Sequence, residues 1–313
     1  MRNRFFLPTL YVILFLSASF FPLDSEALTV GPAKMEFSLD PGNIIEGKLF
    51  LMNEGSEART LYPSFEKFAE VNGAKQFLPG ERTDLSSWLK IDGGVYLEAG
   101  ESKDVPFTLT VPEDAPPGGH FAVIWWGTSP PNTQGGQGTA IITRAGILVY
   151  LNVSGEIQET AEIGTFDTRE GNRLFSRIPE DFNVVFKNTG NVYLKPGGEI
   201  RIKNMLGITT AVLSVNKFGA EILPRSQKEI RVAPESVGWK GFGFGYYTAD
   251  LSLNYGDNMD KQVGAKVGVF VITWQIILPI ILVLFLIFWI STKGIKKYNK
   301  RVIEKYMRMG NKE

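Results

Sequence analysis

The chain offers few side chains for catalysis or metal binding. Its 313 residues include one histidine, His120, and no cysteine. A thiol nucleophile, a disulfide, a cysteine-based metal site and a zinc site built from several histidines are therefore excluded. The sequence around His120 supplies only Glu113 and Asp114 as acids, and a general base needs an oriented nucleophile within hydrogen-bond reach. We favour a structural His120 over a catalytic one.

Three short motifs point weakly to other chemistry. Ser-x-x-Lys occurs twice, at Ser64–Lys67 and Ser214–Lys217. Acyl transfer by such a pair needs a helix that presents both side chains on one face, and both copies lie in apparent strands or loops. The segment GDNMDK has too few oxygen ligands for a calcium loop, and GFGFG lacks the Lys-Ser/Thr of a phosphate loop. We therefore expect neither an enzyme nor a bound cofactor or metal.

The periodicity between the two ends of the chain is that of β-strands. Short runs of β-branched and aromatic residues end at Asn, Gly or Pro, as in FNVVFKNTG and YTADLSLNYG. No convincing helical stripe occurs in the soluble segments. Many short strands with frequent turns predict an all-β protein made of immunoglobulin-like β-sandwiches.

The same order of parts occurs twice along the chain. LFLMNEGSEARTLYP and VVFKNTGNVYLKPGG each contain an apolar strand, an asparagine (Asn53 or Asn188), a glycine two residues later and a second strand that ends at proline. An alternating strand, a proline-containing loop and an aromatic strand then follow in both copies. The repeat predicts two tandem sandwich domains, residues 28–155 and 156–268.

The N-terminus is typical of a secretory signal. Arg2 and Arg4 precede an apolar run from Phe5 to Phe21, and SEA before Leu28 matches a small-residue cleavage site. We therefore predict a signal peptide over residues 1–27. An uncleaved N-terminal anchor is the alternative, although the apolar run is close to the shortest spanning length of about 17 residues.

A second apolar segment, residues 269–291, carries no charge and is long enough to cross a bilayer of about 30 Å. Trp274 and Trp289 lie near its ends, as in an aromatic belt. The following segment, residues 292–313, is basic, and positive charge stays on the cytoplasmic side. We predict a single-pass plasma-membrane protein with a transmembrane helix, extracytoplasmic domains and a cytoplasmic tail. The extracytoplasmic net charge of about −6 argues against nucleic acid as a partner.

The strand that follows His120 is apolar on both faces. In HFAVIWW, alternation places Phe121 and Trp125 on one face and Trp126 on the other. One of these faces must be covered, either by the protein itself or by a sugar ring or protein partner. The polar loop Gly127–Gly138 is expected to be mobile beside it. The candidate partner-binding residues are Trp125, Trp126, Phe121 and, in the second copy, Trp239.

The parts together resemble a known family. VPEDAPPGGHFAVIWW, ITRAGILVYLNVSG, FNVVFKNTG and GYYTADLSLNYG, followed by an apolar helix and a basic tail, resemble the WxL-interacting proteins of bacterial surfaces. Similar strand-and-turn patterns occur in many immunoglobulin-like domains, including periplasmic pilus chaperones. In the WxL-interacting family the first domain is assigned to peptidoglycan binding and the second to host or partner binding. The resemblance implies a membrane-tethered surface scaffold and supplies no ligand residue.

Two functions remain open at the level of sequence. The first is a non-enzymatic, membrane-anchored binding or scaffold protein of the bacterial cell envelope, which holds peptidoglycan or a surface protein partner through its sandwiches. The alternative is a chaperone-like factor that helps to assemble a surface structure by β-strand pairing through AGILVYLNVSG. In that segment the apolar residues alternate as a donor strand requires, at Ala145, Ile147, Val149, Leu151 and Val153.

Overall fold

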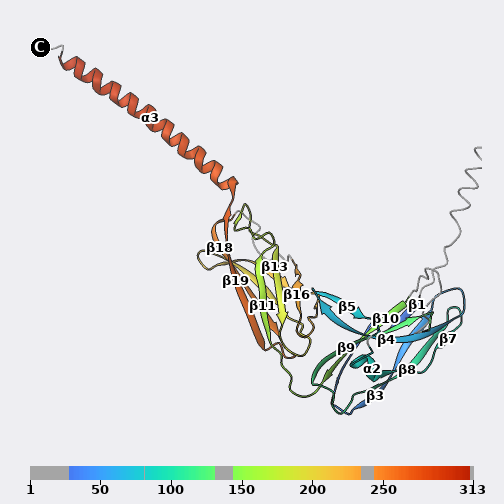
Figure 1. Cartoon of the computed structure of the whole chain (residues 1–313). Helices are drawn as coiled ribbons and strands as arrows, with labels where there is room; N and C mark the ends of the chain where they lie inside the picture. Colours follow the sequence, from blue (N-terminus) through green and yellow to red (C-terminus); the bar gives the residue numbers. More distant parts are fainter. Residues whose placement is uncertain (1–27, 81, 131–143, 234–242, 311–313) are drawn as a thin grey trace, which may run out of the picture. The chain divides into compact units, whose positions relative to one another are not determined.

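The computed structural model describes residues 28–310 except residues 81, 131–143 and 234–242 (Figure 1). It divides into two compact units, Met1–Gln158 and Glu159–Glu313. The fold is mostly β, with four sheets that form two β-sandwiches and one long apolar helix at the C-terminal end. The predicted fold class is therefore confirmed. The predicted signal peptide and Trp239 lie outside the described residues, as does most of the loop Gly127–Gly138.

The first unit is a sandwich of a four-stranded sheet and a six-stranded sheet. The smaller sheet has the order β1-β3-β8-β6 and the larger one β2-β10-β9-β4-β5, with β7 also paired to β4. A short helix, α2 (Leu85–Trp88), precedes β6. The strands are β1 (Leu28–Gly31), β2 (Lys34–Leu39), β3 (Ile44–Asn53), β4 (Arg59–Val71), β5 (Ala74–Leu78), β6 (Leu89–Lys90), β7 (Val95–Leu97), β8 (Ser102–Thr110), β9 (Gly118–Gly127) and β10 (Arg144–Val153).

The core of the first unit lies between these two sheets. Alternate residues of β3 and β8 face it from one side, and alternate residues of β9 and β10 face it from the other. Trp126 of β9 is fully buried there and is the largest side chain in the cluster. Burial of such a side chain contributes about 3 kcal/mol or more to folding.

The N-terminal segment of the first unit passes from one sheet to the other. β1 pairs antiparallel with β3, and after Pro32 the chain continues as β2, which pairs parallel with the second half of β10. That pairing begins at Leu148 and ends at Val153. The first half of β10 therefore has β9 on one side and no paired strand among the described residues on the other.

The second unit repeats the sandwich plan with its own core. Its sheets have the orders β11-β13-β16 and β12-β19-β18-β14-β15-β17. Alternate apolar residues of β13, β14, β18 and β19 fill the space between them. The strands are β11 (Ala161–Thr168), β12 (Leu174–Phe175), β13 (Phe182–Asn188), β14 (Gly197–Asn204), β15 (Thr209–Val215), β16 (Gln227–Ile230), β17 (Val232–Ala233), β18 (Phe244–Tyr255) and β19 (Lys261–Ile272).

The C-terminal helix, α3 (Trp274–Gly310), follows β19 after a single residue, Thr273. Its segment Ile277–Glu304 is long and apolar enough to cross a membrane. The sequence analysis placed the start of the helix at Val269, but Val269–Ile272 form the end of β19. The reason is local, since Val269 and Val271 alternate into the core of the second unit and are fully buried there.

Candidate functional site

The two tryptophans of β9 lie on opposite faces of the sheet. Trp126 is fully buried in the core of the first unit, so it does not reach the surface. Trp125 lies on the outer face and is half-buried. Phe121, also on the outer face, is almost fully buried. Of the candidate partner-binding residues that the structure describes, Trp125 alone therefore presents a substantial surface.

Aromatic side chains of the same sheet cover most of this outer face. Phe68 of β4, Phe121 of β9 and Tyr150 of β10 pack against one another with ring centroids 5.1 to 5.7 Å apart. Phe77 of β5 contacts Trp125 edge-on, with 5.0 Å between the ring centroids. Pairs at these separations are stabilising beyond their buried area. The second apolar face noted in the sequence is thus covered by the protein itself, except around Trp125.

Trp125 is held in place by a carboxylate and a guanidinium. Its indole Nε1 donates a hydrogen bond of 2.9 Å to Glu66 of β4. Arg144, the first residue of β10, donates to the other oxygen of Glu66 at 2.8 Å, and its guanidinium lies 4.4 Å from the centroid of the Trp125 ring. Glu66 is only 8% exposed, so the ion pair and the cation–π contact form in a partly dehydrated setting, where both are stronger.

Sequence reasoning missed Glu66 and Arg144 because their positions along the chain are far from Trp125. The register of the sheet joins them. β4 pairs with β9 so that Glu66 lies opposite Val123, and β10 pairs with β9 so that Arg144 lies opposite Gly127. No motif in the sequence marks either residue.

We call Glu66, Trp125, Arg144 and Gly146, the residue opposite Trp125 on β10, the outer-face cluster.

Gly146 makes room for the tryptophan ring. It lies directly opposite Trp125 in the register of β9 and β10. A Cβ atom at this glycine would stand 2.5 Å from Cζ3 and 2.6 Å from Cε3 of Trp125, which is too close for any side chain. The six-membered ring therefore lies across the backbone of β10. The Trp125 ring thus lies between β4, to which its Nε1 is bonded, and Gly146 of β10.

Over Arg144–Ile147 the side of β10 that β9 does not occupy has no hydrogen-bonded strand among the described residues, although β1 of the facing sheet lies close to β10. We call this stretch the open edge. The backbone N–H of Leu148 donates to the carbonyl oxygen of Ala33, so Leu148 faces the line of β2. Backbone groups of successive strand residues point to alternate sides, so the N–H groups of Gly146 and Arg144 point the same way. From Leu148 onward β2 occupies this edge. Strand pairing with a partner along the whole predicted donor segment is thus incompatible with β2. Only the first half of the segment lacks a paired strand on this side within the part of the chain that the structure describes.

His120 has a partner that its neighbouring sequence did not show. Its Nδ1 contacts the carboxylate of Asp84, and its Nε2 lies 2.8 Å from the carbonyl oxygen of Pro116. Lys67 forms a further ion pair with Asp84 at 3.1 Å. Burial raises the pKa of the Asp84 carboxyl, but the hydrogen bond and charge of His120, together with Lys67, outweigh it and hold this pKa below its ordinary value.

Both ring nitrogens of His120 are therefore engaged with oxygen atoms, and the ring also packs on Trp88 at 4.8 Å. A base needs a free nitrogen directed at a nucleophile, and this arrangement provides none. Ser64 and Lys67 lie three residues apart on strand β4, so they point to opposite faces of the sheet. Within the described residues, no group of three His, Cys, Asp or Glu side chains is placed to hold a metal ion.

The fold and the outer-face cluster define an all-β protein of two immunoglobulin-like sandwiches, with a half-open strand edge in the first. No family model matches the chain, and no curated protein matches it. Solved structures of fimbrial chaperones are similar in fold. The class 5 fimbriae chaperone CfaA is 14% identical, with 79% of this chain and 100% of that one covered and a TM-score of 0.40.

Two further chaperones show the same level of similarity. DraB of E. coli is 12% identical over 76% of this chain and 95% of its own, with a TM-score of 0.37. CupB2 of Pseudomonas aeruginosa is 11% identical over 77% of this chain and 100% of its own, with a TM-score of 0.36. At these identities the similarity concerns the fold alone. Neither these structures nor a family model links the chain to the WxL-interacting proteins.

Proposed function

We propose that the protein is a membrane-anchored, extracytoplasmic binding protein that holds an extended segment of a protein partner by strand pairing at the open half of β10. The proposal takes the membrane-anchored binding role from the first function inferred from the sequence, and it takes the mode of binding, β-strand pairing, from the chaperone-like alternative. The observation that carries the proposal is the open edge itself, which presents the backbone N–H of Gly146 beside the ring of Trp125. An unpaired strand edge is a template for one more strand.

The composition of the open half suits this role better than that of β2. Arg144 is held by Glu66, and the next residues, Ala145, Gly146 and Ile147, carry no charge. β2 instead presents the ion pair of Lys34 and Glu36, and charged side chains on an edge strand oppose pairing. The ring of Trp125 lies over Gly146, one strand away from a partner seated in line with β2. A long side chain of that partner, reaching across Gly146, supplies an aromatic contact in addition to backbone hydrogen bonds.

The chain itself supports a membrane anchor. The segment Ile277–Glu304 of α3 has the length and hydropathy of a spanning helix. Its apolar part is followed by a run of basic residues, and such runs stay on the cytoplasmic side. Both sandwiches precede the helix and would then be extracytoplasmic. The basic residues are Lys293, Lys296, Lys297, Lys300, Arg301, Lys305, Arg308 and Lys312.

The proposal is tested by two substitutions of one residue. Arg144→Ala removes the guanidinium and keeps the backbone N–H, whereas Arg144→Pro also removes the N–H that points to the open edge. The full-length protein in detergent is immobilised and exposed to wall and membrane extracts of its own source. The proline variant should retain a specific partner about fivefold less than the alanine variant, the effect of one lost hydrogen bond of about 1 kcal/mol.

Thermal unfolding of both variants serves as the control, because an edge proline should leave the sandwich folded. Equal retention by the two variants would contradict strand pairing at this edge. Purified peptidoglycan is the second probe in the same experiment. If the wild type sediments with peptidoglycan, and Trp125→Ala abolishes this while Arg144→Pro does not, the outer-face cluster is a sugar-binding platform and strand pairing is wrong.

A further inference from the structure

An exposed apolar patch covers the end of the second unit from which α3 departs. Its members come from four places, which are the β14–β15 hairpin, the start of β18, the end of β19 and, with one residue, β12. Their exposed fractions range from 38% to 76%. We call this set the apolar patch, and it consists of Leu174, Met205, Leu206, Ile208, Phe244, Tyr246, Phe270 and Ile272.

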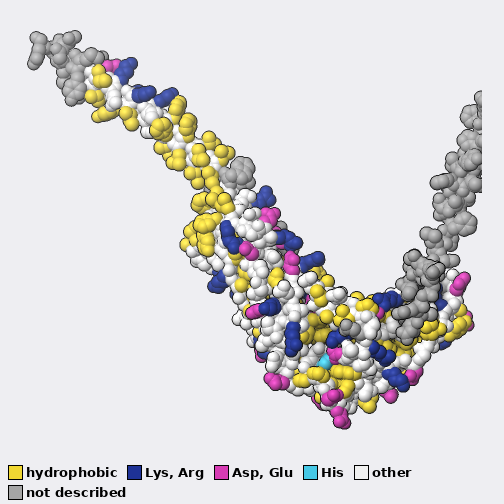
Figure 2. Space-filling model, in the orientation of Figure 1, with side chains coloured by type: hydrophobic (Ala, Val, Ile, Leu, Met, Phe, Trp, Pro, Cys, Tyr) yellow, Lys and Arg dark blue, Asp and Glu magenta, His cyan; other side chains and the backbone are white. Residues whose placement is uncertain are grey.

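The sheet register makes the patch continuous. Phe244 lies opposite Ile272 and Tyr246 opposite Phe270, where the two rings are 5.2 Å apart between centroids. Leu174 pairs with Phe270 from the other side. The hairpin joins through Met205, whose Cε would stand 2.3 Å from a Cβ placed on Gly245. Figure 2 shows hydrophobic side chains gathered at this end of the second unit.

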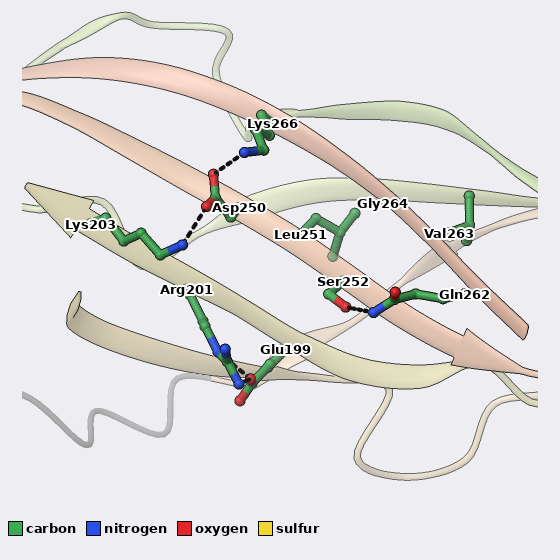
Figure 3. Close-up of a pocket in the computed structure, with 10 residues that line it drawn as sticks. All are labelled: Glu199, Arg201, Lys203, Asp250, Leu251, Ser252, Gln262, Val263, Gly264 and Lys266. Atoms are coloured by element: carbon green, nitrogen blue, oxygen red, sulfur yellow. Dashed lines mark hydrogen bonds and ion pairs between the residues drawn. The ribbon is translucent and has the colours of Figure 1, made fainter. Parts of the chain in front are cut away.

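The outer face of the same sheet changes from charged to apolar along the strands. Away from α3, Asp250 pairs with Lys203 at 2.8 Å and with Lys266 at 3.8 Å, and Arg201 pairs with Glu199 (Figure 3). Moving toward α3, the facing pairs of β18 and β19 are Asp250 and Lys266, Thr248 and Gly268, Tyr246 and Phe270, and Phe244 and Ile272. The face therefore changes from charged at Asp250 to apolar at Phe244, six residues along β18. This is about 20 Å, because a strand rises about 3.3 Å per residue.

The apolar end of this face is tied closely to the start of α3. Thr273, the one residue between β19 and α3, is buried, and its hydroxyl lies 2.7 Å from the carbonyl oxygen of Gly243 and 3.1 Å from that of Ser176, which share its one proton. Ile272 and Trp274 are two residues apart, so their Cα atoms lie within about 7.6 Å of each other whatever the direction of the helix. The apolar patch thus adjoins the first turn of α3 by chain connection alone.

The uncharged part of α3 is only just long enough to cross a bilayer, so it leaves no residues to separate the second unit from the membrane. From Trp274 to Thr292, the last residue before Lys293, the uncharged part of the helix is about 19 residues or about 28 Å long. The hydrocarbon core of a bilayer is about 30 Å thick. If α3 spans the bilayer, its first turn must lie at the membrane interface. Because the apolar patch adjoins that first turn, it then lies at the membrane interface as well.

We infer that the apolar patch inserts into the headgroup and acyl boundary of the outer leaflet and seats the second unit directly on the lipid bilayer. The inference rests on the membrane anchor in the proposed function and goes beyond it. Aromatic and aliphatic side chains of this kind bury their apolar parts in that boundary, while the ion-paired residues further up the sheet remain in water. The second unit is therefore in direct contact with the membrane and is not a domain connected to it by a flexible linker.

The test uses the absence of cysteine from the chain. Met205 in the patch and Met259 in the β18–β19 hairpin are both exposed methionines, at opposite ends of the same sheet. Met205→Cys, Met259→Cys and Leu284→Cys are each made in the full-length protein, labelled with a fluorophore and reconstituted in phosphatidylcholine vesicles. One set of vesicles contains a lipid with a shallow nitroxide quencher, and a second set contains a lipid with a nitroxide near the bilayer centre. Leu284 lies within α3 and reports on the anchor.

The label at Met205 should lose emission to the shallow quencher, the label at Leu284 should lose it to the deep quencher, and the label at Met259 should lose it to neither. The loss at Met205 should persist in high salt, because insertion is apolar, and should be reversed by Phe244→Ser with Leu206→Ser. A quenched Leu284 with an unquenched Met205 would overturn the inference and leave the anchor intact. An unquenched Leu284 would overturn both. A Met205 label shielded from water but unquenched by lipid would mean that a second copy of this chain covers the patch, and it would also overturn the inference.

Discussion

Asn53 in the first unit and Asn188 in the second make the same set of hydrogen bonds. Each is fully buried at the end of a strand, and each accepts a hydrogen bond on Oδ1 from the backbone N–H two residues later, at Gly55 and Gly190. Each also donates from Nδ2 to the carbonyl oxygen four residues later and to a carbonyl across the sandwich. The two asparagines fix the same turn in both sandwiches.

Replacement of either asparagine by alanine should destabilise its own unit by about 1–3 kcal/mol, because buried carbonyl and N–H groups lose their partners. Urea unfolding of residues 28–158 and of residues 159–273, expressed separately, measures each effect. Each part has its own core and should unfold cooperatively. Asn172→Ala, at an exposed position, is the control and should stay within about 0.5 kcal/mol of the wild type. A similarly small effect at Asn53 and Asn188 would refute a shared structural role.

The two tryptophans of β9 should differ in what they contribute. Trp126→Ala empties the centre of the first core and should cost about 3–5 kcal/mol of unfolding free energy. Trp125→Ala removes a half-buried ring from the outer-face cluster and should cost clearly less, while it weakens partner binding. Unfolding in urea and retention of the partner are measured on the same preparations. Equal losses of stability without any selective loss of binding would make both residues part of the scaffold.

The contact between Asp84 and His120 predicts a dependence of stability on pH. The folded state holds the pKa of Asp84 below its ordinary value of 3.8, so folding favours the ionised carboxylate. This contribution is present above the unfolded pKa and is lost as the pH falls through the folded pKa. Residues 28–158 should therefore lose this part of their stability as the pH falls below about 4. Asp84→Asn, which keeps the size and shape of the side chain at this positive-φ position, should flatten that loss. An unchanged slope would contradict the assignment.

The orientation of the chain is tested by protease added outside intact spheroplasts. If the basic tail stays inside, digestion should remove the two sandwiches and leave a small fragment that contains α3 and the tail. An antibody against an epitope after residue 310 detects this fragment, and lysed cells show whether the tail itself is cleavable. Sandwiches that survive digestion outside but not after lysis would place them in the cytoplasm and contradict the proposed topology.

The sequence predicts the strands, the tandem arrangement and the C-terminal helix because each depends on local periodicity. It also predicts two faces for the strand of Trp125 and Trp126, since alternation follows directly from strand geometry. It does not show which face is the core. That depends on which strands pair with β9, and therefore on contacts such as Trp125 with Glu66 that join distant positions. The apolar patch was missed for the same reason, because its residues meet only through the register of β14, β18 and β19.

The half-open edge of β10 is tested most directly by amide hydrogen exchange at two residues of that strand. The N–H of Leu148 is bonded to Ala33 and should exchange slowly in the free protein, whereas the N–H of Gly146 points to the open edge and should exchange fast. When the partner retained by the wild type is added, Gly146 should become protected and Leu148 should stay as it was. Protection of Gly146 in the free protein, or exchange there that the partner leaves unchanged, would contradict strand pairing at this edge.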